Sequence, residues 1–183
     1  MAVTSHDFTS LIRWTGDCGQ GAADYRGYDR TWDIVTPGKT VIDCSNDPMP
    51  GGDPSRPNPE DLLLSALAAC HMLLFLHLAS RDGLVVKSYE DAPLGEGETA
   101  PDGAGRFVSA TLRPRIGLAS GIYPDAAGRL HLEVGRYCFI ARSVGSPVHH
   151  DATYFTVQAA FHASQCGMRK MARNCLPSLS RPR

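Results

Sequence analysis

One stretch, residues 58–83, constrains the fold of this chain more than any other. Asn58 is a good helix N-cap, Pro59 suits the first helical position, and no helix breaker follows until Gly83. We therefore expect a helix of about 24 residues, roughly 36 Å long. Within its apolar part, residues 62–79, the polar side chains are Ser65, His71 and His77. We expect the rest of the protein to wrap a helix that is apolar all round.

The other elements that the sequence predicts are short strands and one further helix. Runs typical of strands, bounded by turn signals, cover residues 8–14, 22–28, 31–36, 41–44, 84–89, 107–118 and 153–160. Pro114 inside one of these runs indicates an edge position or a bulge. Residues 93–105 are predicted as a polar, Gly-rich loop, and residues 126–144 as a second, weaker helix. Because strands and helices do not alternate regularly, the predicted class is α+β.

Length and charge restrict the class of protein further. The 183 residues suit one domain, which we place at residues 1–157, followed by a basic C-terminal tail at residues 158–183. A formal net charge of −1 gives no reason to expect nucleic acid or a membrane surface as a partner. Binding of nucleic acid by the tail is the alternative to a solvated, partly disordered tail. Residues 62–79 are near the lower length limit for a membrane span and contain two histidines, so we expect no span.

The start of the chain and its cysteines bear on the compartment and on metals. Residues 1–7 are short and polar, unlike a secretory signal, which favours a cytoplasmic protein. The six cysteines contain no CxxC pair, so the spacing does not suit zinc, and in a reducing compartment most of them are free thiols. His149 and His150 could form a metal site with His71 or Asp151, but we expect neither a metal nor another cofactor.

Cys70, in the apolar middle of the long helix, is the first candidate for chemistry. Buried cysteines are commonly inert core residues, and that interpretation stays open. Cys138, however, lies on the second predicted helix, and two thiols on two packed helices suit a peroxidatic and a resolving pair. In that chemistry one thiolate attacks an O–O bond, and the second thiol condenses with the resulting sulfenic acid.

These residues lie within motifs that resemble a known family. The segment Asn58-Pro59-Glu60, with Cys70 ten residues after the glutamate, and the later segment around Cys138 resemble the OsmC/Ohr superfamily of osmotically induced and organic hydroperoxide resistance proteins. The resemblance covers about residues 10–150. It implies an OsmC-like fold with antiparallel β-sheets wrapped around the long helix and a second helix. It also implies an intertwined homodimer with active sites at the subunit interface.

The resemblance further implies a thiol-dependent peroxidase that reduces organic hydroperoxides. Cys70 would be the peroxidatic cysteine, Cys138 the resolving cysteine, and Glu60 the residue that orients a catalytic arginine. For that arginine we expect Arg30, with Arg26 second and Arg56 third. The reductant would be a dithiol such as a lipoyl group. An apolar lining along residues 62–75 favours a small hydrophobic hydroperoxide.

Helix geometry adds a condition on this site. A buried cysteine needs a nearby cation to be a thiolate at neutral pH. Glu60 and Cys70 lie roughly 15 Å apart along one helix axis, too far for both to contact one arginine. We therefore expect Glu60 of one subunit to approach Cys70 of its partner.

Two other functions remain to be weighed. One is a non-catalytic module that binds a small molecule in a hydrophobic pocket at the dimer interface. The other is a thiol hydrolase that uses Cys70 with His71. Adjacent helical residues point about 100° apart, which makes direct proton transfer between these two side chains unfavourable. We expect His71 to be a hydrogen-bonded interface residue, with tuning of the thiol or substrate binding as the alternative.

Overall fold

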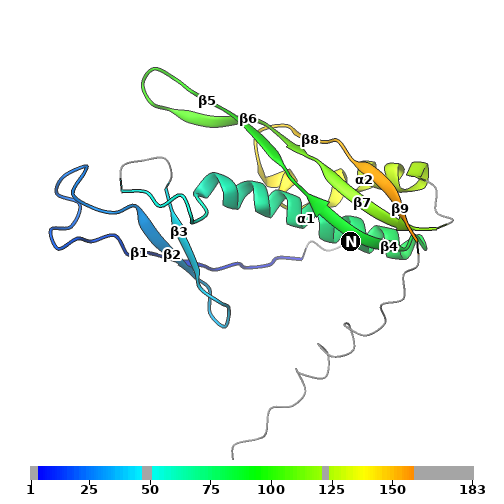
Figure 1. The fold of residues 1–183 in the computed structure, drawn as a ribbon, viewed down its shortest axis with the longest axis horizontal. Helices are drawn as coiled ribbons and strands as arrows, with labels where there is room; N and C mark the ends of the chain where they lie inside the picture. The colour runs from blue at the N-terminus through cyan, green and yellow to red at the C-terminus, as the bar shows by residue number, and fades with distance from the viewer. Residues whose placement is uncertain (1–3, 47–50, 121–123, 159–183) are drawn as a thin grey trace, which may run out of the picture.

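The computed structural model describes residues 4–46, 51–120 and 124–158. A three-stranded antiparallel sheet lies at one end of the molecule, and the two helices with the remaining strands form a larger body (Figure 1). The N-terminal sheet consists of β1 (Leu11–Trp14), β2 (Thr31–Val35) and β3 (Ile42–Ser45). The body consists of α1 (Pro59–Arg81), β4 (Val86–Asp91), β5 (Leu94–Thr99), β6 (Gly105–Leu112), β7 (Pro114–Ala119), α2 (Pro124–Tyr137), the 3₁₀ turn η1 (Ala141–Ser143), β8 (Val148–His150) and β9 (Thr153–Val157).

The long helix α1 has the predicted start and nearly the predicted end. Asn58 Oδ1 accepts a hydrogen bond from the Asp61 N–H at 2.8 Å, and the Asp61 carboxylate accepts one from the Asn58 N–H at 3.2 Å. This reciprocal pair is a capping box, and Pro59 occupies the first helical position. The helix contains 23 residues, and Gly83, at a φ of 73°, lets the chain leave it.

The prediction that the rest of the chain wraps α1 is wrong. The helix α1 is long and apolar enough to cross a membrane, by length and composition only. Of its most apolar 18-residue stretch, only 28% is buried in the described structure. One side packs on α2 and the strands of the body. The other side exposes Ser65, Ala66, Ala69, Leu73 and His77, at helical spacing. An apolar helix with an open side requires a second covering surface, which residues 4–46, 51–120 and 124–158 do not supply.

The predicted α+β class with two helices is confirmed, and the body sheets contain parallel as well as antiparallel strand pairs. One sheet has the order β4-β7-β9 and another the order β5-β6-β8; β7 pairs with β9, and β6 with β8, in parallel. The run 107–118, predicted as one strand, is divided between β6 and β7, because Arg113 and Pro114 stand where the chain passes from one sheet to the other. Of the N-terminal strands, the one predicted at 22–28 is absent: those residues form turns.

The predicted loop at residues 93–105 is instead most of a β-hairpin, β5–β6. Its first strand alternates glycine with glutamate and so lacks the apolar side chains that mark a strand. A Cβ at Gly95 would lie 2.3 Å from the Phe107 ring and 3.1 Å from Leu64. The missing side chain therefore lets the strand approach these two residues closely.

The core lies between the two helices and the sheet β4-β7-β9. Phe75 and Leu78 of α1 meet Leu130 and Val134 of α2 and Ile116 of β7, all of them buried. A smaller cluster joins Leu67 of α1 to Ala110 and Leu112 of β6. The core therefore fixes one face of α1 against α2, and Cys70 and Cys138 lie in that region.

The second helix is shorter than predicted. Residues 126–144 were expected to be helical, but α2 ends at Tyr137, so Cys138 follows the helix directly. The Cys138 N–H still donates to the Val134 carbonyl at 2.9 Å, which continues the helical pattern for one residue. The basic tail predicted at residues 158–183 lies, apart from Gln158, outside the described residues.

Candidate functional site

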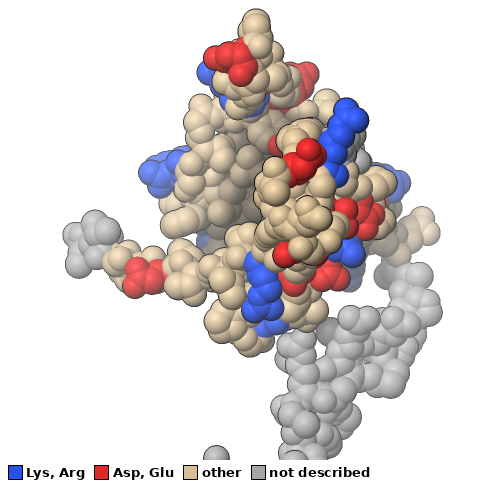
Figure 2. All heavy atoms as spheres, turned by 90° about the vertical axis from the view of Figure 1, so that its left-hand side faces the viewer, with Lys and Arg blue, Asp and Glu red and all other residues tan. Residues whose placement is uncertain are grey.

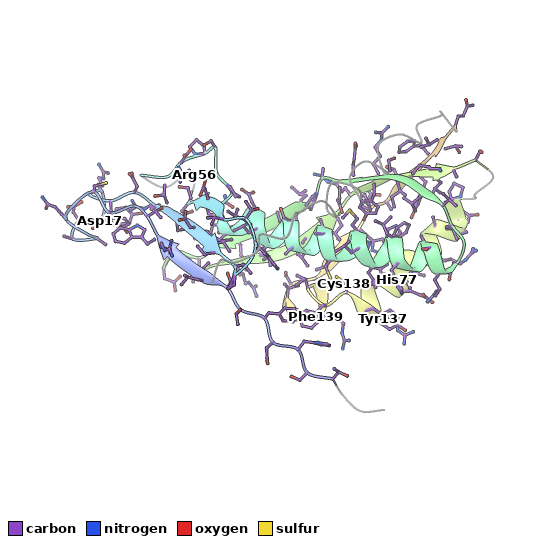
Figure 3. All side chains as sticks on the ribbon, turned by 90° about the horizontal axis from the view of Figure 1, so that it is seen from below. Asp17, Arg56, His77, Tyr137, Cys138 and Phe139 are labelled. Carbon is purple, nitrogen blue, oxygen red and sulfur yellow. The ribbon has the colours of Figure 1, made fainter. Side chains whose placement is uncertain are left out.

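The two cysteines singled out in the sequence lie together in the body. The side chain of Cys70, on α1, is half-buried, and Cys138, directly after α2, is 1% exposed. The Cys70 and Cys138 side chains pack in the same cluster and lie close enough for Cys70 to raise the pKa of the Cys138 thiol. Figure 3 shows Cys138 beneath the middle of α1, where α2 ends. Two helices thus bring together two thiols that are 68 positions apart in the chain.

The surroundings of Cys138 keep it protonated. Its pKa is raised from 9.0 to about 11, chiefly by burial and also by the neighbouring Cys70, while backbone N–H groups at Ala141 and Ile140 act in the opposite direction. A thiol with this pKa is neutral at pH 7. It therefore suits the partner that condenses with an oxidised sulfur better than the sulfur that attacks first.

The arginine candidates lie on the N-terminal side of the chain. The buried Arg30 directly precedes β2; its guanidinium donates to the carbonyls of Tyr25 and Tyr28 and lies 4.5 and 4.4 Å from the centres of their rings. Arg26 is exposed, and Arg56 pairs with Asp53 at 3.0 Å. Figure 3 shows Arg56 near the start of α1, well away from Cys138.

The predicted site is therefore not assembled among the described residues of one chain. Among the described residues, none of the three arginines forms a hydrogen bond or ion pair with Glu60, and no hydrogen bond joins one of them to Cys70. Glu60 is exposed in the first turn of α1, ten residues before Cys70. The structure brings the two cysteines together but not the glutamate and the arginine, and their roles stay predictions.

Histidines next to the dithiol form a cluster whose joint role the sequence did not suggest. His71 Nε2 lies 2.7 Å from His131 Nδ1, and both side chains are buried. His131 stacks on Phe75, with ring centres 4.6 Å apart, and on His150, with ring centres 5.0 Å apart. One sequence signal was present: His131 lies on the same face of α2 as Leu130, Val134 and Cys138, so it had to point inward.

Burial keeps the histidine pair neutral. The pKa of His71 is lowered to about 4, chiefly by burial and also by His150. The pKa of His131 is lowered to about 3, chiefly by burial and also by His71 and His150. The His131 ring stacks on the rings of His71 and His150, while the His71 and His150 rings are tilted by 37° to each other. Within the described residues no group of three or more His, Cys, Asp or Glu side chains is arranged to hold a metal ion.

Further buried polar groups line up behind His131. Tyr89 on β4 and Tyr154 on β9 both lie opposite Ile116 of the strand between them, and their side chains extend toward the helices. Their hydroxyls, His131 Nε2 and Asp91 Oδ2 are buried without a hydrogen-bond partner in the described structure. Burial raises the pKa of Tyr154 to about 12 and raises that of Asp91. This side of the body is thus polar as well as apolar.

Four hollows on the described surface are lined by neither Cys70 nor Cys138; three lie near the hairpin β5–β6, and one lies between the end of α1 and β4. One of about 470 Å³ is lined by Leu63, Phe107, Val108, Val144, Pro147 and Arg106, among others. Another of about 530 Å³ includes Glu60 and Leu64 of the first turns of α1. Both are open and partly apolar, and they flank the end of α1 that faces the N-terminal sheet.

Comparisons with known proteins agree on the family and the fold. The family model described as OsmC-like protein matches residues 52–153, more than half of the chain. No protein of curated function matches. The structure is similar to that of an OsmC-like protein of unknown function from Vibrio cholerae, with a TM-score of 0.74, 24% identity and coverage of 81% of this chain and 100% of that one.

Two further solved structures carry a functional description. An organic hydroperoxide resistance protein OsmC from Legionella pneumophila has a TM-score of 0.57 and 17% identity, with 84% of this chain and 100% of that chain covered. The organic hydroperoxide resistance protein OhrB of Bacillus subtilis has a TM-score of 0.54 and 17% identity, with 81% and 98% covered. At these identities the likeness establishes the shared fold.

Proposed function

This chain belongs to the OsmC-like protein family, and on that premise we propose that it is a thiol-dependent peroxidase that reduces organic hydroperoxides. The proximity of the Cys70 and Cys138 thiols, which pack in one cluster between the helices, is the observation that carries the proposal. Fold similarity alone is weak support for an activity, whereas two neighbouring thiols that are far apart in the sequence form a more specific arrangement. Solved relatives described as organic hydroperoxide resistance proteins support the choice of substrate class.

The two cysteines take different roles in the proposed reaction. The Cys70 thiolate attacks the terminal oxygen of the hydroperoxide, and the O–O bond breaks. Cys70 becomes a sulfenic acid, and the alkoxide leaves as the alcohol after it takes up the proton that Cys70 gave up. The Cys138 thiol then attacks this sulfur. An S–S bond forms, and the sulfenic hydroxyl leaves with the thiol proton as water. An external dithiol, such as a lipoyl group, returns both cysteines to the thiol state.

Cys70 rather than Cys138 is the attacking sulfur for two reasons. Cys70 is half-buried and so accessible to a substrate, whereas Cys138 is 1% exposed. Burial also holds Cys138 in the neutral form, which does not attack peroxides. The neutral Cys138 therefore suits the role of the resolving cysteine, which reacts only after Cys70 has become a sulfenic acid.

A homodimer completes the proposed site. The exposed side of α1 and the apolar face of the N-terminal sheet both need a cover, and a second copy provides one for each. Such a dimer would bring Arg30, held by Glu60, to Cys70 of the partner and so stabilise the thiolate. Arg26 and Arg56 are the next candidates. The dimer, the substrate and a cytoplasmic location are parts of the proposal.

One observation favours a second function, a non-catalytic module that binds a small molecule. Among the described residues no cation lies in hydrogen-bond contact with Cys70, and open hollows with apolar linings flank the start of α1. In that case a dimer would close these hollows into a pocket. The cysteines would then serve only as packing residues.

The test is consumption of cumene hydroperoxide in the presence of dihydrolipoamide. We expect turnover by the wild type, none by Cys70→Ser, and in Cys138→Ser a single oxidation that stalls at the Cys70 sulfenic acid. Cys44→Ser is the matched control, because Cys44 is fully buried in the N-terminal sheet and has no thiol partner there. A wild-type protein that leaves the hydroperoxide intact, with Cys70 inert to alkylation, would leave the binding module as the better proposal.

A further inference from the structure

The proposed peroxidase chemistry makes no use of the histidine pair beside the dithiol. His71 directly follows Cys70 on α1. His131 lies seven residues before Cys138, two turns or roughly 10 Å along α2. Each partner of the 2.7 Å hydrogen bond is therefore fixed to one of the two cysteines by its own helix.

The rest of the contact between the two helices has little directional character. It is made of apolar side chains such as Phe75, Leu130 and Val134, whose attraction depends on the area buried and not on an angle. A hydrogen bond loses strength steeply as its distance and angle change. In the described chain the other side-chain hydrogen bond between α1 and α2 is the exposed ion pair Arg81–Glu133, and exposed pairs are weak.

The surroundings of His131 keep its ring in one orientation. Phe75 and His150 stack on it at interplanar angles of 23° and 24°. Its Nδ1 is aimed at His71, while its Nε2 is buried without a partner. An unpaired buried nitrogen costs stability, and a leucine at this position would avoid that cost. Stability alone therefore does not account for a histidine here.

We propose that the His71–His131 hydrogen bond sets the register of α1 against α2 and so holds the Cys138 thiol against Cys70. Both histidines are positioning residues. The reaction step that they serve, attack of Cys138 on the Cys70 sulfenic acid, rests on the proposed peroxidase function. The contact between the two thiols does not depend on that function.

Three substitutions of His131 separate the hydrogen bond from the volume of the ring. His131→Asn places an amide group close to the position of Nδ1, where it can still bond His71. His131→Gln places the amide close to the position of Nε2, on the far side, and His131→Leu removes the polar group. His77→Leu is the matched control, because His77 is exposed on α1 and faces away from α2.

The first measurement needs no peroxidase activity. Each variant is oxidised with diamide, and the Cys70–Cys138 disulfide is quantified over time by peptide mass spectrometry. We expect wild type, His131→Asn and His77→Leu to form it at similar rates, and His131→Gln and His131→Leu to form it about tenfold to a hundredfold more slowly. Equal rates in all five proteins would overturn the proposal.

The second measurement uses one equivalent of cumene hydroperoxide with dimedone present to trap the sulfenic acid on Cys70. We expect the rate of Cys70 oxidation to be unchanged in His131→Gln, while the trapped adduct replaces the disulfide. A general loss of structure would slow both steps together, which would overturn a positioning role. If wild-type Cys70 does not react, the peroxidase proposal fails while the diamide comparison still decides the positioning role. Should His131→Leu not fold, the Asn and Gln variants carry the comparison.

Discussion

The N-terminal sheet and the helical body bury their apolar residues in different ways. In the body, Phe75, Ile116 and Val134 are fully buried by elements of the same chain. In the N-terminal sheet, Ile12, Ile34 and Ile42 stand side by side across the three strands, and Ile12 and Ile42 are 58% and 45% exposed. Figure 2 views the molecule from this end, where much of the surface is neither acidic nor basic. The body is complete in one chain, whereas the sheet is not.

This difference shows where a second copy of the chain is needed. A three-stranded sheet requires another layer on its apolar face, and this sheet extends beyond the start of α1 without one (Figure 1). The helix α1 has the complementary deficiency, since its side opposite α2 is open. In a dimer, the N-terminal sheet of one copy can be covered by the sheet or by α1 of the other copy. The open side of α1 can be covered in the same two ways. The following changes test that contrast, from the largest expected effect to the smallest.

The substitution Phe75→Ala tests whether the body holds most of the stability. Phe75 is fully buried between α1, α2 and Tyr89, so we expect a loss of about 3–5 kcal/mol in the free energy of unfolding. Phe8→Ala is the control, because Phe8 is 78% exposed and its change should stay within about 0.5 kcal/mol. Urea denaturation followed by circular dichroism measures both. Equal losses would contradict the contrast between the regions.

The substitution Ile12→Asp tests the open face of the N-terminal sheet. In a monomer a charge at this exposed position is nearly harmless, but in a dimer that covers the sheet it is buried without a partner. We expect the dissociation constant of the dimer, measured by sedimentation equilibrium, to rise at least about a hundredfold, while the fraction of folded protein stays unchanged. Arg13→Gln, on the opposite face of β1, should leave the dimer intact. A wild type that sediments as a monomer would remove the basis of this prediction.

Acid tests a property that the body has and the strands β1–β3 lack, a buried histidine pair. The pKa of His71 falls from 6.5 to about 4, and that of His131 to about 3, so the unfolded chain binds more protons than the folded one between these values and 6.5. Stability is therefore full above about pH 6.5 and is lost as the pH falls toward 4 and 3. At pH 5 each histidine costs about 2 kcal/mol relative to pH 8.

Urea denaturation at a series of pH values measures this loss. His150 adds to this loss, because burial lowers its pKa too, while the partly buried Asp91 acts in the opposite direction, because its raised pKa favours the folded state at low pH. His131→Leu should flatten the curve between pH 5 and 6.5. His77→Leu should not change it. A His131→Leu curve as steep as that of the wild type would show that the loss arises elsewhere.

The sequence predicted best where local signals decide the structure. Asn58, Pro59 and Gly83 fix the ends of α1 through capping and backbone geometry alone, and both ends were predicted to within about a residue. The strand β5 was missed because its glycines resemble a loop. Gly95 is needed there because Phe107 on the next strand lies too close for a side chain, and no local sequence pattern contains that contact. The cover of α1 was predicted wrongly for a similar reason. An apolar helix indicates burial but does not say which chain provides it.

The candidate site divides along the same line. Cys70 was placed on α1 by its position in the sequence, but its contact with Cys138 depends on how two helices pack. The bond between His71 and His131 depends on that packing too, and the sequence offered only the inward face of α2 as a signal. Glu60 and Arg30 lie on parts of the chain that the body does not enclose. Their predicted meeting depends on a second copy and so lies beyond what one sequence or one chain contains.

The smallest expected effect concerns the exposed link between the helices. Glu133 of α2 accepts a hydrogen bond from Arg81 of α1 at 3.0 Å, with the two side chains 45% and 50% exposed. Glu133→Gln removes this charge pair and leaves the second partner of Arg81, Asp82, in place at 2.7 Å. Because water and salt screen such a pair, we expect a loss of under about 1 kcal/mol, and no loss at 1 M salt. The rate at which diamide joins Cys70 to Cys138 should not change. If Glu133→Gln slowed that rate as much as His131→Gln does, the surface link, and not the buried one, would set the register of the two helices.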